Sequence, residues 1–529
     1  MKKILALLLI TTLTFSTPFG FNIIKTEGKV KTIKVNKKNF PDKKFRKCLK
    51  KCEEYKGGKI KTEVDEINLS GVKNYKGLER FTFIVELSIK SNVATNITIE
   101  GTNKTKVEQL SLKSSKNNTI TIKNLKLDTI EALSKNRAKL VLDNISLVDR
   151  KSLLDVYDHF NGVEIINCNT LDFLRISGNK LNSIKISNCS SLKDIDCSES
   201  GLYNISFNNL KKLTTLDCSS NNIKKLDFPQ NFNTIKELCV KGNKLGNYDY
   251  SKFSALKELD CTNTGITKFD LSKNTTLESL YCGANPFASI DVTRNVNLKK
   301  FVLTKSGVKS IDLSKLNKLK ELTINNTSIS TINLSVLKNL EELTLKNGIF
   351  KSVNLNNNMK LRNIEVKKNR ELTNIILPKS KVEVSIDCSN NKLSKLDVSK
   401  NKGLYSLDCN DNKLEKLNIS KNKKLLGLDC SHNKLRKLST SKNKKLDYLD
   451  CSNNKIRKLN LSKNKILSEL YCSNNKLKKL NIRKNKELIE LNCKHNKIKK
   501  LDIRKNKDLD REDLKCDKKV KIIKKKKRK

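Results

Sequence analysis

The chain has 529 residues, with 109 Lys and Arg against 55 Asp and Glu, and its net charge is +54. Apolar residues make up only 36%, with 18 Gly, 5 Pro and no Trp, which excludes collagen-like, Pro/Gly-rich and multi-span membrane proteins. Low apolar content with high charge is typical of disordered chains, but the repeats described below predict a folded array.

Residues 1–20 predict a secretory signal peptide. Two lysines follow Met1, residues 4–13 carry no charge, and small or turn-forming residues follow up to Gly20. The alternative is an uncleaved anchor helix, which the short apolar run disfavours because a membrane span needs about 20 apolar residues. We therefore expect a secreted, extracellular or cell-wall-associated protein without a transmembrane span once the signal is removed.

Residues 21–83 predict a small helical N-terminal cap module. The stretches "NFPDKKF" and "INLSGVKNYKGLERF" resemble the N-terminal module of secreted bacterial leucine-rich-repeat proteins. That resemblance implies a loop that can bind calcium, here at residues 53–58. The loop "EEYKGG" lacks the alternating Asp and Asn ligands of a calcium loop, so we predict no metal site and no cofactor.

Two classes of repeat follow the cap. Residues 84–175 contain degenerate repeats, in which pairs such as Leu110/Leu112 and Ile120/Ile122 recur at irregular spacing. Residues 176–508 contain regular repeats with a 21-residue period, each with two short apolar–x–apolar segments that predict strands. Residues 509–529 predict a closing segment and a basic tail.

Each half of a regular repeat ends at an Asn that we expect to be buried at a bend, where its amide can bond unpaired backbone groups. One structural Asn ladder comprises Asn391, Asn412, Asn433, Asn454, Asn475 and Asn496, and the second comprises Asn401, Asn422, Asn443, Asn464, Asn485 and Asn506.

The repeat pattern resembles the nested 21-residue subclass of bacterial leucine-rich repeats, LxxLxCxxNxLxxLxLxxNxx. The resemblance implies a leucine-rich-repeat solenoid, mostly β with short parallel strands and irregular coil. At a strand spacing of about 4.8 Å, the coils in the Cys phase predict a rod of roughly 70 Å.

The chain has 16 Cys, and most mark the repeat. Cys388, Cys409, Cys430, Cys451, Cys472 and Cys493 recur with a constant 21-residue spacing, and the same phase continues upstream through Cys282, Cys261, Cys239, Cys218 and Cys197. Other repeats place Ile, Leu or Val in this slot, so we interpret the ladder as buried free thiols. Cys48 and Cys52, four residues apart in the expected cap helix, leave a disulfide to another loop as an alternative.

The sequence offers no candidate catalytic residues. Its 3 His include His432 and His495, which replace Asn or Asp at a bend of the repeat. Phosphate loops, His-Glu-x-x-His motifs and nucleophile elbows are missing from the sequence. We therefore expect a protein that is not an enzyme.

Lysines recur at fixed positions in the last six repeats, and residues 381–529 hold 45 basic against 18 acidic residues, a difference of +27. The first two columns, four and seven residues after each Cys, are candidate polyanion-binding residues. They are Lys392, Lys395, Lys413, Lys416, Lys434, Lys437, Lys455, Lys458, Lys476, Lys479, Lys497 and Lys500. The columns either bind polyanions or reflect composition and recent repeat duplication.

These features favour a non-catalytic secreted or cell-surface binding protein that mediates protein–protein or host-surface interaction, as an adhesin does. One alternative is an electrostatic binder of anionic cell-wall or glycan polymers such as teichoic acid, sulfated glycan or mucin. Another is a secreted effector with an unrecognised activity. Aromatic residues are only 5%, which argues against specific nucleic-acid binding by base stacking. Asp387, Asp408, Asp429 and Asp450 predict an acidic stripe on the first strand of the repeats.

Overall fold

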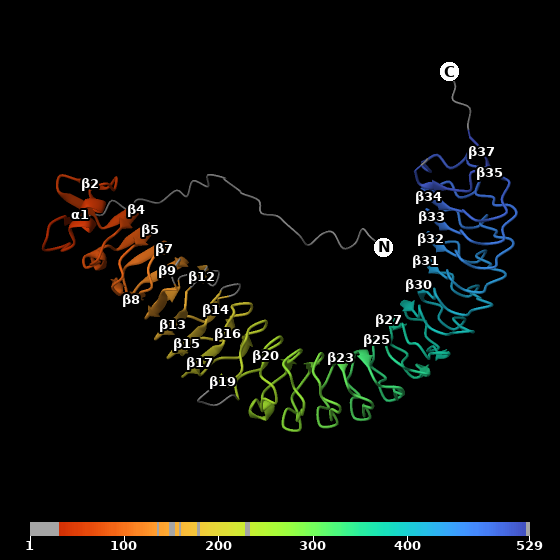
Figure 1. Cartoon of the computed structure of the whole chain (residues 1–529), viewed down its shortest axis with the longest axis horizontal. Coiled ribbons are helices and arrows are strands. Elements are labelled where there is room, and N and C mark those ends of the chain that lie inside the picture. Colours follow the sequence, from red (N-terminus) through yellow and green to blue (C-terminus); the bar gives the residue numbers. More distant parts are fainter. Residues whose placement is uncertain are drawn as a thin grey trace, which may run out of the picture.

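The computed structural model describes residues 31–134, 137–147, 154–157, 160–176, 180–227, 233–510 and 512–524. The predicted signal peptide, His159 and residues 525–529 of the predicted basic tail lie outside the described residues. The described chain folds as a leucine-rich-repeat solenoid whose coils are joined by parallel strands. The coils stack into an open arc rather than a straight rod (Figure 1). A small rotation at each coil accumulates into such curvature.

The N-terminal cap combines one helix with a small antiparallel sheet. The helix α1 (Lys43–Leu49) begins after Asp42, whose Oδ1 accepts from the backbone N–H groups of Lys44 (2.8 Å) and Phe45 (3.0 Å). The three strands of the sheet are β1 (Thr32–Lys34), β2 (Tyr55–Lys56) and β3 (Lys59–Lys61), and the 3-10 helix η1 (Leu78–Arg80) leads to the coils.

The structure corrects two details of the expected cap. The loop compared with a calcium loop is a β-hairpin, in which Gly57 and Gly58 turn with φ of +57° and +79° between β2 and β3. Helix α1 ends at Leu49, so Cys48 lies in the helix and Cys52 lies beyond it. Both thiols are free and half-buried.

The first coils carry two parallel sheets. One sheet comprises β4 (Glu63–Ser70), β5 (Phe83–Ser91), β7 (Lys106–Ser114), β9 (Lys126–Ser134), β11 (Ser146–Leu147) and β12 (Leu154–Tyr157). The other comprises β6 (Ile97–Glu100), β8 (Thr119–Lys123), β10 (Lys139–Asp143), β13 (Gly162–Ile166), β15 (Ser183–Ser187), β17 (Asn204–Asn208) and β19 (Leu226–Asp227). The predicted pairs Leu110/Leu112 and Ile120/Ile122 lie in β7 and β8, on the two sheets, with all four side chains buried.

A continuous 17-stranded parallel sheet runs through the remaining coils. Its strands are β14 (Phe173–Arg175), β16 (Asp194–Asp196), β18 (Thr215–Asp217), β20 (Glu237–Cys239), β21 (Glu258–Asp260), β22 (Ser279–Tyr281), β23 (Lys300–Ser306), β24 (Glu321–Thr327), β25 (Glu342–Lys346), β27 (Asn363–Lys367), β29 (Val384–Asp387), β30 (Leu404–Asp408), β31 (Gly427–Asp429), β32 (Tyr448–Asp450), β33 (Glu469–Tyr471), β34 (Glu490–Asn492) and β36 (Leu514–Lys515). This sheet lines the inner, concave side of the arc (Figure 1).

Beyond β19, the other side of these coils is mostly irregular. Two short pairs occur there, β26 (Ser352–Asn354) with β28 (Asn374–Ile376) and β35 (Lys500–Asp502) with β37 (Lys521–Ile523). A 3-10 helix, η2 (Tyr250–Lys252), begins after Asp249. The strands β36 and β37 lie in the predicted closing segment and add the last strand to each face.

The Cys slot of the repeats is buried. Cys388, Cys409, Cys430, Cys451, Cys472 and Cys493 are each no more than 2% exposed and carry free thiols. Burial raises the pKa of the Cys493 thiol to about 12, so the thiol form is favoured inside this core. The inward residues of each coil share one continuous core with the neighbouring coils.

The placement of Cys239 in this buried ladder was wrong. Cys239 pairs in register with Asp217 and Asp260, which face outward from the sheet, and its side chain is partly exposed. The next residue, Val240, fills the buried slot and is 0% exposed. The coil from β18 to β20 is one residue longer than the period, since Leu216 pairs with Leu238, so a Cys placed 21 residues after Cys218 falls on the outward face.

One residue per coil adopts a left-handed backbone conformation after the Cys slot. The positive φ values include 56° at Asn390, 50° at Asp411, 51° at His432 and 56° at His495. Asn, Asp and His tolerate this region better than most residues. Both described His residues therefore serve as bend residues, which agrees with their interpretation from the sequence.

The two Asn series lie at the bends and bond neighbouring backbone. In the first, Asn433 Nδ2 donates to the carbonyls of Cys409 (2.9 Å) and Ser431 (3.0 Å), while its Oδ1 accepts from Leu414 N–H (2.9 Å). In the second, Asn443 Nδ2 donates to the carbonyls of Ile419 (2.9 Å) and Asn422 (2.8 Å). Members of both series are buried, except Asn496, which is partly exposed near the C-terminal end.

Candidate functional site

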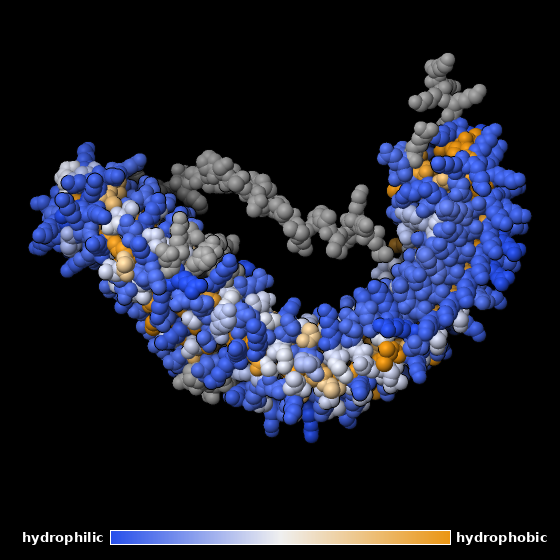
Figure 2. Space-filling model, viewed as in Figure 1, coloured by the Kyte–Doolittle hydropathy of each residue, from blue (hydrophilic) through white to orange (hydrophobic). Residues whose placement is uncertain are grey.

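The two predicted Lys columns lie on the irregular side of the coils, outside the 17-stranded sheet. Lys392 is partly exposed and the other eleven members are exposed. Within the described residues, Lys392 is the member that forms an ion pair, with its Nζ 3.1 Å from Glu371 Oε1. The remaining ammonium groups face solvent, and hydrophilic side chains cover the C-terminal coils in the space-filling view (Figure 2).

Two adjoining grooves lie between the last coils of this basic side. The first has a volume of about 750 Å³ and is lined by Lys478, Lys479, Leu480, Asn481, Arg483, Lys497, Lys499, Lys500, Asp502, Arg504 and Ile523. The second, of about 940 Å³, shares Lys478, Lys479, Asn481 and Lys497 and adds Arg457, Lys458, Leu459, Asn460, Ser462, Lys476 and Lys484. We call these two together the basic grooves.

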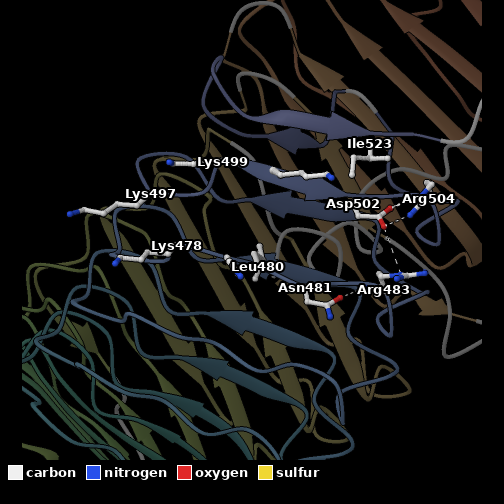
Figure 3. A pocket seen from close by; sticks show the side chains of 11 residues that line it. Lys478, Leu480, Asn481, Arg483, Lys497, Lys499, Asp502, Arg504 and Ile523 are labelled. Atoms are coloured by element: carbon white, nitrogen blue, oxygen red, sulfur yellow. Dashed lines mark hydrogen bonds and ion pairs between the residues drawn. The ribbon is translucent and has the colours of Figure 1, made fainter.

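Arginines neutralise the acidic residue that lines the basic grooves. Arg504 donates to both oxygens of Asp502, from Nε to Oδ1 at 3.0 Å and from NH2 to Oδ2 at 2.9 Å. Arg483 Nε lies 3.8 Å from the same Oδ2 (Figure 3). The hydrogen bonds from Arg504 hold the pKa of Asp502 well below its usual range. The groove lining therefore keeps a large positive excess, the charge that an anionic polymer needs.

The grooves bring together five of the twelve predicted lysines: Lys458, Lys476, Lys479, Lys497 and Lys500. The other seven lie outside this lining. The sequence prediction missed Lys478, Lys499, Arg457, Arg483 and Arg504, which line the same grooves. A signal was present, because the position six residues after the Cys changes from Ser394 and Glu415 to Arg and then Lys toward the C-terminus.

The concave sheet has the opposite charge. Four neighbouring strands, β29 to β32, each end in an Asp, and these residues pair in parallel register. They are Asp387, Asp408, Asp429 and Asp450. The acidic character extends upstream of the predicted stripe along the same two outward columns. Further acidic members are Asp194, Asp196, Asp217, Glu237, Glu258, Asp260, Glu321, Glu342 and Glu365.

The acidic side chains of the concave sheet are partly desolvated. Each of Asp408, Asp429 and Asp450 accepts from the backbone N–H two residues later, at 3.0, 2.9 and 2.8 Å. Burial raises the pKa of Asp408 to about 7, and the charges of Asp429 and Asp387 add to the rise. Burial also raises the pKa of Asp450. A partner that supplies positive charge would relieve this repulsion.

The substitution Asp408→Asn is expected to change the pH dependence of stability. The folded-state pKa near 7 exceeds the ordinary value of 3.8, so the folded protein binds more protons in this window and loses stability as pH rises through it. The Asn side chain does not ionise, so the variant does not lose stability as pH rises. Its Oδ1 can still accept from the backbone N–H of Asn410. We expect a free energy of unfolding about 1–2 kcal/mol above the parent at pH 8, after allowance for solvent screening, with little difference below pH 4.

Thermal unfolding followed by circular dichroism at acid and alkaline pH measures this effect. The matched control is Asp397→Asn, because Asp397 makes the same turn bond to Ser399 N–H (2.8 Å) and that bond lowers its pKa. The control should lose stability above pH 4, the opposite sign. The same pH profile in both variants would contradict the prediction.

The sequence matches no protein-family model and no curated protein. Among solved structures, the chain is similar to YopM from Yersinia enterocolitica, with a TM-score of 0.51, 17% identity and coverage of 91% of this chain and 93% of that chain. It is also similar to a leucine-rich-repeat protein of Leptospira interrogans, with a TM-score of 0.47, 21% identity and coverage of 57% and 78%. A third is the functional domain of InlJ from Listeria monocytogenes, described as including a cysteine ladder, with a TM-score of 0.35, 18% identity and coverage of 94% and 77%.

The likeness to YopM agrees with the solenoid fold seen here. Among the described residues, none of the helices is long and apolar enough to cross a membrane.

Proposed function

We propose that the protein is a secreted or cell-surface, non-catalytic binding protein that mediates protein–protein or host-surface interaction, in the manner of an adhesin. We also place its repeats in the nested 21-residue subclass of bacterial leucine-rich repeats. The observation that carries the proposal is the open concave sheet of 17 strands, which no other helix or sheet of the described residues covers. Such extended curved surfaces are what solenoids use for binding.

Cell fractionation combined with a binding assay tests this function. We expect the native protein in the wall or medium fraction of its source cells, and purified residues 21–529 to bind intact host cells. Trypsin treatment of those cells should abolish binding if the ligand is a protein. Retention in the cytosolic fraction, or an absence of binding to any cell surface, would contradict the proposal.

The second candidate function is binding of anionic polymers such as teichoic acid, sulfated glycan or mucin. The specific observation in its favour is the lining of the basic grooves, where Asp502 is the acidic residue and both of its oxygens are bonded to Arg504. A polyanion lying along the grooves would release its counterions, which favours binding at low salt.

The triple variant Lys458→Ala, Lys479→Ala and Lys500→Ala tests the polymer-binding function. We expect roughly tenfold weaker binding to heparin, and a slope of log affinity against log salt that is smaller by about 2, because three cationic contacts are lost. The matched control replaces Lys395, Lys416 and Lys437, which belong to the same column but lie outside the grooves. Equal losses in the two variants would mean that diffuse charge, rather than the grooves, holds the polymer.

A further inference from the structure

The concave surface of β30 to β34 is acidic, like the upstream part of the same sheet, although the molecule as a whole is basic. Its two outward columns read Ser406, Gly427, Tyr448, Glu469, Glu490 and Asp408, Asp429, Asp450, Tyr471, Asn492. They contain five carboxylates and no Lys or Arg, although the whole chain carries a net charge of +54. This acidic surface therefore favours a positively charged partner, whereas the basic grooves favour a negatively charged one.

Exposed apolar residues lie in β30 and directly before β31 and β34. Tyr405, Leu426 and Ile489 are 39%, 45% and 47% exposed. Tyr405 and Leu426 occupy one position of two adjacent coils, because Leu426 N–H bonds Tyr405 O, and Ile489 occupies the same position three coils further on, after Asp447 and Ser468. On β32 and β33, the rings of Tyr448 and Tyr471 lie with their centroids 5.8 Å apart. The adjacent pair Tyr405 and Leu426 therefore forms an exposed apolar patch beside the carboxylates, and such a patch marks a contact surface.

We propose that the concave surface of β30 to β34 docks a Lys- and Arg-rich segment of another protein that also carries apolar residues. This inference rests on the proposed protein-binding function and names the chemistry of its partner. The cationic side chains would pair with the Asp column and with Glu469, whereas Glu490 Oε1 already lies 3.7 Å from Lys515 Nζ. The apolar side chains would cover Tyr405, Leu426 and Ile489.

The spacing of the carboxylates supports an extended cationic segment. Asp408, Asp429 and Asp450 are direct neighbours in parallel register, and adjacent strands lie about 4.8 Å apart. A segment that crosses the strands therefore meets one carboxylate at each step. An acidic polymer meets repulsion at every one of these steps, so the surface discriminates by sign.

The test uses the triple variant Asp408→Asn, Asp429→Asn and Asp450→Asn in the full chain. Asn keeps the oxygen that accepts the turn bond and removes the charge. The matched control is Asp270→Asn, Asp291→Asn and Asp312→Asn, because these exposed residues make the same bond to the N–H two residues later, each at 2.8 Å, away from the 17-stranded sheet. Thermal unfolding establishes that both variants are folded.

Fluorescence anisotropy then measures binding of a labelled peptide of Lys, Arg and Leu, with a Glu and Leu peptide as the opposite-sign probe. We expect the basic peptide to bind the parent chain and the control variant equally, and the concave triple variant at least about tenfold more weakly. The acidic peptide should bind none of them through this surface. Equal binding of the basic peptide to both triple variants would overturn the proposal.

The cell-binding assay separates this proposal from the proposed function. Trypsin-sensitive binding to host cells that is unchanged in the concave triple variant would keep the protein-binding function and overturn the proposed surface. Analytical ultracentrifugation tests whether a second copy of this chain occupies the concave surface instead. Self-association that the concave triple variant abolishes would overturn the assignment to another protein, because a second copy would then supply the cationic segment.

Discussion

Replacing Asn443 by Ala is expected to lower the free energy of unfolding of the C-terminal coils by about 1–3 kcal/mol, because two buried hydrogen bonds are lost. Asn443 is 0% exposed, and its Nδ2 donates to the backbone carbonyls of Ile419 and Asn422 in the preceding coil. Ala would remove one of two donors from each carbonyl, because the backbone N–H of Asn422 still donates to Ile419 O and that of Leu425 to Asn422 O. Removing a partner from a buried polar group costs more than the net gain of a typical hydrogen bond.

The loss should also divide the unfolding transition. Each coil of a solenoid contacts only its neighbours, so its stability depends on nearest-neighbour interfaces. Weakening the interface at Asn443 uncouples the coils on its C-terminal side. Urea unfolding followed by hydrogen exchange should show earlier exchange in coils beyond this residue than in β14 to β25.

The control for Asn443→Ala is Asn418→Ala. Asn418 is exposed, and its Oδ1 accepts only from Ser420 N–H (3.1 Å) among the described contacts. Its replacement should cost no more than about 1 kcal/mol. Equal losses in the two variants would show that the buried amides do not carry the inter-coil stability that their geometry indicates.

Much of the fold could be predicted because each coil buries side chains at the same positions of the repeat. The 21-residue spacing from Cys388 to Cys493 predicts one inward slot per coil, and all six thiols are buried. The Asn series could be predicted for the same reason, since a polar residue kept at a bend between apolar segments needs backbone partners. Aligning the repeats with one another shows which positions are buried, and the sequence of a single coil does not show this.

Departures from the period were harder to predict. At Cys239 a step one residue longer than the period moves the thiol to the outer column, and only the strand register shows this. The residues 84–175 read as degenerate because their two sheets alternate through coils of unequal length. The acidity of the concave sheet could likewise be recognised only from the strand register. Glu237, Glu321 and Glu342 fall into one column once the strands are paired.

The basic grooves were predicted in part for a related reason. The invariant lysines stand out in the sequence, but a groove is formed by whichever side chains border it. Arg457, Lys478 and Lys499 share one position that varies among coils, so repetition does not reveal them. The sequence therefore predicted that this side of the solenoid is positively charged. The residues that form its grooves could be identified only from the structure.

Replacing Gly403 by Ala is expected to destabilise the protein by about 3 kcal/mol or more, because a new side chain would overlap backbone. A Cβ at this buried glycine would lie 2.0 Å from the carbonyl oxygen of Val382 and 2.6 Å from that of Lys381. The clash is specific to this coil, since the equivalent residues of the next coils include Lys424, Lys445 and Ile466.

The irregular coil before β30 explains why a glycine is needed there. The step from Val366 to Cys388 is one residue longer than the usual period, and the pairing of β29 with β30 shifts register between Val384 and Ser385. The extra residue brings the chain near Val382 against the next coil, where only a residue without Cβ fits. The register shift and the glycine are thus one local adjustment.

The control for Gly403→Ala is Gly427→Ala. A Cβ at Gly427 would meet only the Oγ of Ser406, at 4.0 Å, so the change should stay within about 0.5 kcal/mol of the parent. Thermal and urea unfolding of both variants measure the difference. If Gly403→Ala proved as stable as Gly427→Ala, the chain near Val382 would have to move away from β30 at little cost, and the coil-to-coil contact at this register shift would not limit stability.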